Sequence, residues 1–262
     1  MKAPWKYAIA ASALISIAAL ITVLDISNAS VQKEKTCSGI EVEFPGSNGI
    51  NFISKTDVKN YIARDYGTVS GKRLEEVNLT AIEEILDGKS SVLKSEAYTT
   101  CDGILHILIL QRRPAVRFIS QSGSWYADSE GYIFPTQKNC TCHVPIVDGN
   151  IPVNLTPGHK GKADTAKERT WIEGVLSLVD FLDGSRRWED AIVQIHVAND
   201  GRLVLVPRVG KELFIFGRPE DFARKFAKIE DYYKFIVPEK GKDFYKSVNV
   251  SVDGQIVCRE KD

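Results

Sequence analysis

Hydrophobic residues follow three kinds of pattern along this chain, and each pattern predicts a different element. Residues 7–24 form an apolar stretch without charge, which at about 1.5 Å per residue is long enough to cross the hydrocarbon core of a bilayer. Residues 104–110 are aliphatic except for His106, which favours a buried strand. Elsewhere, apolar residues recur at three- and four-residue intervals and indicate amphipathic helices.

Charges on either side of the apolar stretch predict its orientation. Lys2 and Lys6 precede it and Asp25 follows it, and positive charge stays on the cytoplasmic side of a membrane. We therefore expect a single-pass inner-membrane protein with a cytoplasmic N-terminus and the bulk of the chain in the periplasm. The expected segments are a short cytoplasmic tail, a transmembrane helix and a juxtamembrane spacer, at residues 1–6, 7–24 and 25–36.

A cleaved signal peptide is the alternative for this segment, because Ser27-Asn28-Ala29 offers small residues for cleavage. The apolar stretch exceeds the usual signal-peptide core of about 7–15 residues, so we favour an uncleaved anchor. Both alternatives export the remainder of the chain.

Residues 37–113 carry the pattern of one small α+β domain. The expected order of elements is strand, helix, helix, strand and strand, with both helices on one face of the sheet. Ser54 followed by Asp57 marks the start of the first helix, and Asn78 marks the start of the second. The turn Asp102-Gly103 separates the last two strands.

Residues 114–262 predict a second domain, a mostly antiparallel sheet that carries two helices. Short apolar stretches between turn signals indicate its strands, and Asn199-Asp200-Gly201 predicts a hairpin. An apolar face from Trp171 to Leu182 predicts one helix, and Pro219 marks the expected start of the other.

Charge and motifs narrow the function. Lys+Arg and Asp+Glu both number 34, and a net charge of zero argues against a nucleic-acid partner. The sequence has no phosphate-binding loop, nucleophile elbow or zinc-protease helix. Cys140-Thr141-Cys142-His143 lacks a second ligand pair at zinc-site spacing. We therefore expect no catalytic residue, metal, cofactor or small-molecule substrate.

The two exported units resemble the FtsQ/DivIB bacterial cell-division proteins. The first unit resembles their POTRA domain at Phe52-Ile53-Ser54, Asp57-Val58, Gly71, Leu74, Asn78, Ile82-Glu83, Leu86, Leu105, Ile107, Ile109 and Gln111 to Ala115. The second unit resembles their β domain at Tyr126, Asp128, Gly131, Pro145-Ile146-Val147, Gly149, Gly217, Phe226-Ala227-Lys228 and Gly254 to Val257. The order and spacing of these residues carry the resemblance, which covers nearly the whole chain.

The resemblance implies a scaffold without catalysis that recruits and holds division proteins at the septum. The implied partners are membrane-anchored coiled-coil proteins of the FtsB/FtsL type. A strand near the C-terminus would form a sheet edge, and an incoming strand could pair with its backbone. We expect the partner-binding surface at Tyr245, Val248, Val250, Val252, Gly254, Gln255 and Val257.

Five cysteines lie in the exported part of the chain, where an oxidising compartment permits disulfides. If the first strand of the first domain lies parallel to residues 104–110, Cys37 comes near the turn that holds Cys101. A Cys37–Cys101 disulfide is therefore a further expectation.

Two other functions are compatible with an exported chain of this kind. A POTRA-bearing module for envelope export or assembly would normally carry several POTRA units or a long barrel pattern, and the sequence contains neither. An exported enzyme of unrecognised type would need a convergent set of polar residues, and the sequence marks out none.

Overall fold

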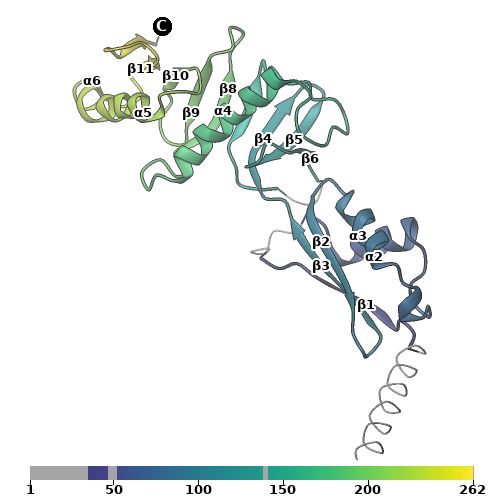
Figure 1. Cartoon of the computed structure of the whole chain (residues 1–262). Helices are drawn as coiled ribbons and strands as arrows, with labels where there is room; N and C mark the ends of the chain where they lie inside the picture. The colour runs from purple at the N-terminus through teal and green to yellow at the C-terminus, as the bar shows by residue number, and fades with distance from the viewer. Residues whose placement is uncertain (1–34, 47–51, 138–140, 262) are drawn as a thin grey trace, which may run out of the picture. The chain divides into compact units, whose positions relative to one another are not determined.

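The computed structural model describes residues 35–46, 52–137 and 141–261, and it divides the chain into two compact units, Met1–Gln111 and Arg112–Asp262 (Figure 1). Each unit is described by itself. The transmembrane helix expected at residues 7–24 lies outside the described residues. Within the described ranges, no helix is long and apolar enough to span a bilayer.

The first unit is a three-stranded sheet with two helices on one face (Figure 1). The central strand, β3, pairs in parallel with β1 and antiparallel with β2. The α+β prediction for this unit is confirmed. Its elements are β1 (Gly39–Glu43), α2 (Lys55–Asp65), the 3₁₀ helix η1 (Leu74–Glu76), α3 (Leu79–Asp87), β2 (Val92–Thr99) and β3 (Ile104–Gln111).

Both helices of this unit begin where the capping residues predicted. The Ser54 hydroxyl accepts from the Asp57 amide at 3.1 Å, and the Asp57 carboxylate accepts from the Ser54 amide at 2.9 Å. This reciprocal capping box satisfies two helix-end amides, and the Ser54 hydrogen bonds lower the pKa of Asp57. At α3, the Asn78 side chain accepts from the Ala81 amide at 3.1 Å.

The second unit is a nine-stranded sheet of order β12-β11-β10-β9-β8-β7-β4-β5-β6. Its elements are β4 (Pro114–Ser120), β5 (Gly123–Asp128), β6 (Ile133–Pro135), β7 (Ile146–Gly149), α4 (Ala166–Asp183), β8 (Ile192–Val197), β9 (Leu203–Pro207), β10 (Leu213–Gly217), α5 (Phe222–Asp231), η2 (Tyr232–Ile236), α6 (Val237–Lys240), β11 (Tyr245–Asn249) and β12 (Val257–Glu260).

The sheet is mixed, which refines the mostly antiparallel prediction. β7 is parallel to both β4 and β8, and β10 is parallel to β11. Helices explain two of these parallel pairs, because α4 connects β7 to β8, and α5 lies in the connection from β10 to β11. The chain returns from β4 to β7 through β5 and β6. A strand that returns parallel to its predecessor needs such a crossover, whereas a tight turn returns the chain antiparallel.

Helix α5 starts later than its proline indicated. Pro219 and Glu220 precede the helix, and Asp221, the residue before it, has φ of 55° in the left-handed region. A left-handed residue breaks the helical path, so α5 starts only at Phe222. The chain then continues through η2, a π-helix, into α6.

Two neighbouring tyrosines in η2 meet the core differently. Tyr232 is fully buried, and its hydroxyl has no hydrogen-bond partner among the described residues. Burial raises the pKa of Tyr232 to about 12. The neighbouring Tyr233 hydroxyl bonds to the Glu212 carboxylate, and burial together with this carboxylate raises the pKa of Tyr233 strongly.

We predict that Tyr232 makes the protein sensitive to alkaline pH. Its ordinary pKa is 10.0, so between pH 10 and 12 the unfolded chain loses this proton while the folded protein keeps it. The free energy of unfolding therefore falls as pH rises, by roughly 2–3 kcal/mol from Tyr232 alone. Tyr232→Phe reduces this loss. At pH 7 the same variant equals or exceeds the parent in stability, because an unpaired buried hydroxyl is removed.

The matched control is Tyr233→Phe, which removes a hydroxyl that has a partner. Chemical unfolding at pH 7 is expected to show this variant destabilised by about 1–3 kcal/mol. Equal destabilisation by both substitutions at pH 7 would contradict the assignment of Tyr232 as the unpaired hydroxyl.

Candidate partner-binding edge

Among the strands that the structure describes, the nine-stranded sheet ends at β12, which pairs with β11 alone. β11 itself lies between β12 and β10 and is paired on both sides. The outer backbone of β12 therefore presents N–H and C=O groups that no strand of the sheet covers. The described part of the sheet has an edge near the C-terminus, formed by Val257–Glu260, and partner binding at this end of the chain stays a prediction.

The predicted site residues fall into two groups. Tyr245 and Val248 belong to the interior strand β11, and Val248 and Val250 are fully buried in the core. Val248 and Val250, which directly follows β11, support the edge strand from the core, because their side chains are enclosed. Tyr245 is only partly buried against the same core. The others lie in the connection between β11 and β12 or at the start of β12. They are Val252, Gly254, Gln255 and Val257.

Three residues of the edge strand were not among those predicted, namely Cys258, Arg259 and Glu260. A signal for them exists, since the turn residues Asp253-Gly254 must be followed by a return strand. Val257, at the start of β12, is 46% exposed, whereas Cys258 packs partly against the core. Burial raises the pKa of the Cys258 thiol, and this side chain packs against the core as a small apolar group.

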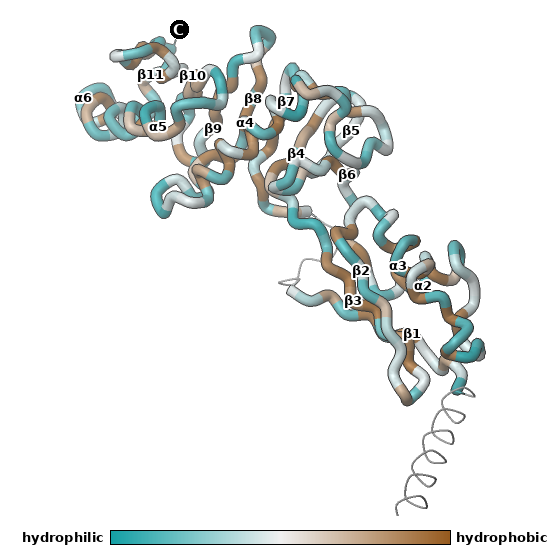
Figure 2. Tube along the Cα trace, viewed as in Figure 1, coloured by the Kyte–Doolittle hydropathy of each residue, from teal (hydrophilic) through white to brown (hydrophobic). Residues whose placement is uncertain are grey.

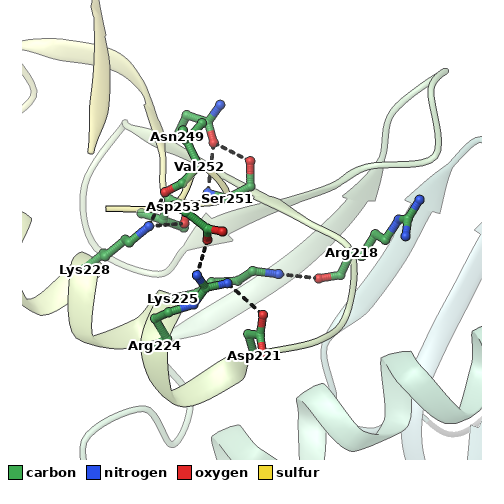
Figure 3. Close-up of polar contacts among 10 residues, drawn as sticks. Arg218, Asp221, Arg224, Lys225, Lys228, Asn249, Ser251, Val252 and Asp253 are labelled. Carbon is green, nitrogen blue, oxygen red and sulfur yellow. Dashed lines mark hydrogen bonds and ion pairs between the residues drawn. The ribbon is translucent and has the colours of Figure 1, made fainter. Parts of the chain in front are cut away.

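The connection between β11 and β12 is held by basic side chains of α5, as Figure 3 shows. The Lys228 ammonium donates to the carbonyl of Val250 at 3.2 Å and also to that of Val252. Arg224 pairs with Asp253, and at 2.7 Å with Asp221 before the helix. We call Arg224 and Lys228 the α5 clamp. It fixes the chain segment that leads into the edge strand.

Two further features fix the connection between β11 and β12 close to the end of β10. The Ser251 amide and hydroxyl both donate to the Asn249 side-chain oxygen, at 2.9 and 2.7 Å. Gly217, at the end of β10, has φ of 79°, and a Cβ there would lie 2.9 Å from Cβ of Ser251. Only glycine allows this approach without displacing the connection.

Buried Lys225, also on α5, completes the anchoring (Figure 3). Its ammonium donates to the Arg218 carbonyl at 2.8 Å and lies 4.7 Å from the centre of the Phe216 ring. Desolvation lowers the pKa of this lysine. A buried ammonium needs such partners, and its bond to Arg218 ties the helix to the loop that follows β10.

An open hollow of about 550 Å³ lies between these segments. Basic and acidic side chains line it together, so it does not present a single sign of charge. They are Arg202, Arg218, Arg224 and Lys225 with Asp200, Glu220, Asp221 and Asp253. Throughout the described residues, no three His, Cys, Asp or Glu side chains gather as metal ligands would. The geometry here is that of a supported strand edge.

Comparison with known families agrees with this architecture. Residues 113–259 match the family described as FtsQ/DivIB, C-terminal related, and residues 35–110 match the POTRA-like domain. The chain belongs to the FtsQ/DivIB C-terminal-related family. No curated protein matches its sequence. Membership indicates a division-protein-like role in the cell envelope, in a family whose members are generally non-catalytic.

The Cys37–Cys101 disulfide expected from the sequence stays a prediction. β1 lies parallel beside β3 as expected, and the Ser38 amide donates to the carbonyl of Gly103 in the turn beyond Cys101. Cys37, however, is a free thiol with a buried side chain, and its Sγ lies 3.4 Å from the Gly39 carbonyl. Cys101 is exposed. The bond is not formed in this structure and stays a prediction for the oxidised protein.

We predict that the α5 clamp determines how rigidly the edge is held. Lys228→Met keeps the length of the side chain and removes its charged donor. Loss of hydrogen bonds from a charged donor is expected to lower the free energy of unfolding by about 1–3 kcal/mol. Amide exchange at residues 251–253, measured by mass spectrometry, is expected to become faster than in the parent.

Exposed Lys242 provides the matched control. Lys242→Met removes the same charge away from the β11–β12 connection and is expected to change the free energy of unfolding by less than about 0.5 kcal/mol. Unchanged exchange at residues 251–253 in Lys228→Met would show that the clamp does not hold the connection.

Proposed function

We propose that this protein is a non-catalytic scaffold of the division complex. Residues 7–24 anchor it in the inner membrane, and its periplasmic units recruit and hold septal division proteins. Its partners in this proposal are membrane-anchored coiled-coil proteins of the FtsB/FtsL type. The observation that supports the proposal is the edge strand Val257–Glu260 in a chain of the FtsQ/DivIB C-terminal-related family. Within the described residues, this strand has a neighbouring strand on one side only.

The chemistry of the edge supports capture by strand addition. A strand from the partner would pair with the outer backbone of β12, and backbone hydrogen bonds would supply the affinity. Side chains alternate along a strand. The exposed Val257 and Arg259 lie on the face opposite Cys258 and are suited to contact the partner's side chains. The connection at Val252, Gly254 and Gln255 flanks this surface.

We predict that proline in β12 separates partner capture from folding. Cys258→Pro and Arg259→Pro remove amides that point to opposite sides of the strand, since neighbouring amides alternate in direction. One variant breaks a bond to β11 and destabilises the unit. The other proline variant removes an amide that points away from β11. It is expected to unfold at the same midpoint as the parent. In calorimetric titration it is expected to lose binding to an FtsB/FtsL-type periplasmic domain.

A pair of serine substitutions tests the side-chain contribution to the same binding. Val257→Ser is expected to weaken capture about three- to tenfold, because an apolar contact is lost. Val209→Ser is the control, since Val209 is 78% exposed in the β9–β10 turn. If both proline variants bind the partner as tightly as the parent does, the strand-addition proposal is wrong. If Val257→Ser and Val209→Ser weaken binding equally, Val257 is not a specific contact of the partner.

We also predict recruitment of the full chain to the division septum. A fluorescent fusion at the N-terminus is expected to concentrate at midcell in dividing cells. A POTRA-bearing export module or an exported enzyme would instead be distributed along the envelope. Uniform fluorescence with an intact fusion would therefore reject the scaffold and favour one of these two alternatives.

A further inference from the structure

The three-stranded sheet of the first unit has a second face that the described helices of this unit leave uncovered. Leu105, Ile107 and Ile109 of β3 are fully buried toward α2 and α3. The alternate residues of the same strand face the other way, because side chains alternate across a sheet. They are Ile104, His106, Leu108 and Leu110, of which Leu110 is 41% exposed. Figure 2 shows the hydrophobic character of this strand.

Strand β2 adds apolar surface to this face at both ends. An irregularity in the pairing between Val92 and Lys94 breaks the alternation, so Leu93 and Lys94 are both exposed. Bulges of this kind redirect side chains, and Leu93 reaches 42% exposure. Toward the other end, Tyr98 stacks on His106 with ring centres 5.0 Å apart. We call Leu93, Tyr98, Ile104, His106, Leu108 and Leu110 the open face.

Carboxylates border the open face on both sides. Leu108 stands between Glu43 of β1 and Glu96 of β2, which are its partners in the two neighbouring strands. Two residues before Leu108, His106 has Glu41 of β1 as its partner, and a Glu41 carboxylate oxygen lies 3.7 Å from the His106 Nδ1. Against these three carboxylates, β2 places the basic Lys94 on the same face, 3.5 Å from Glu96. The apolar row is therefore framed by excess negative charge.

The dimensions of the row fit a helix. Residues 104–110 extend over roughly 20 Å at about 3.3 Å per residue, which equals a helix of about 14 residues at 1.5 Å per residue. A sheet face covered by a helix is a standard packing arrangement. A helix that presents an apolar stripe with Lys or Arg on both borders would bury the row and meet the carboxylates of β1 and β2.

We propose that the open face docks a cationic amphipathic helix of a partner protein. Charge decides between this occupant and others. A second copy of the same face, or an anionic lipid surface, would bring negative groups against Glu41, Glu43 and Glu96. The open face belongs to the first unit and β12 to the second. Helix docking depends on apolar and charged side chains, whereas strand capture depends on backbone hydrogen bonds, so each proposal can be tested without the other.

The test uses the full chain in zwitterionic nanodiscs, with empty nanodiscs subtracted. The probe is a fluorescent synthetic helix of about 14 residues, with Leu on one face and Lys on both borders. Anisotropy titration is expected to show saturable binding. The dissociation constant is expected to rise at least tenfold in the double variant Glu43→Lys/Glu96→Lys and in Leu108→Ser. A probe with Glu in place of every Lys is expected not to bind.

The matched control is Glu75→Lys/Glu84→Lys, which makes the same change in net charge at exposed residues of η1 and α3. Binding to this control is expected to equal that of the parent. Equal weakening by both double variants, equal binding of the Glu probe, or no binding of the Lys probe would overturn the proposal. A photoreactive group on the probe supplies a readout that does not depend on affinity, since cross-links are expected in β2 and β3 and not in β12.

Discussion

Helical cover on one face of each sheet is the constraint on which the molecule depends. A sheet is stable in water only when apolar side chains on at least one face are shielded, and both units achieve this with helices that follow from their chain connections. In the first unit, the alternate residues of β3 on the face that carries α2 and α3 are fully buried. In the second, α4 and α5 are crossovers that bring parallel strands together. The sheet face and the strand edge that these helices leave uncovered are the surfaces open to contact from outside.

The first unit was largely predictable, because its signals are local. Ser54, Asp57 and Asn78 sit at helix starts where their side chains bond backbone amides within three residues, and such signals survive in any context. The hairpin around Asp102-Gly103 is equally local. The open face was not predicted, because an aliphatic run in the sequence does not reveal that α2 and α3 cover one of its two faces and not the other.

Long-range pairing limited the prediction of the second unit and of the site. The Val248, Val250 and Val252 alternation indicates a strand, but only the register shows that β11 pairs on both sides and that the edge passes to Val257–Glu260. Nothing in the sequence around Lys228 indicates that its ammonium donates to the carbonyls of Val250 and Val252. Strand edges and the side chains that hold them are properties of the assembled sheet, so the periodicity of hydrophobic residues in the sequence does not predict them.

The shortness of β12 has a consequence for how a partner must be presented. An edge of 4 residues offers few backbone hydrogen bonds, and each contributes only about 0.5–1.5 kcal/mol net. Such an edge would capture a freely diffusing chain weakly. If protein and partner are both anchored in one membrane, confinement raises their effective concentration, and weak pairing becomes sufficient. In the proposed scaffold, the anchor would thus contribute to affinity as well as to location.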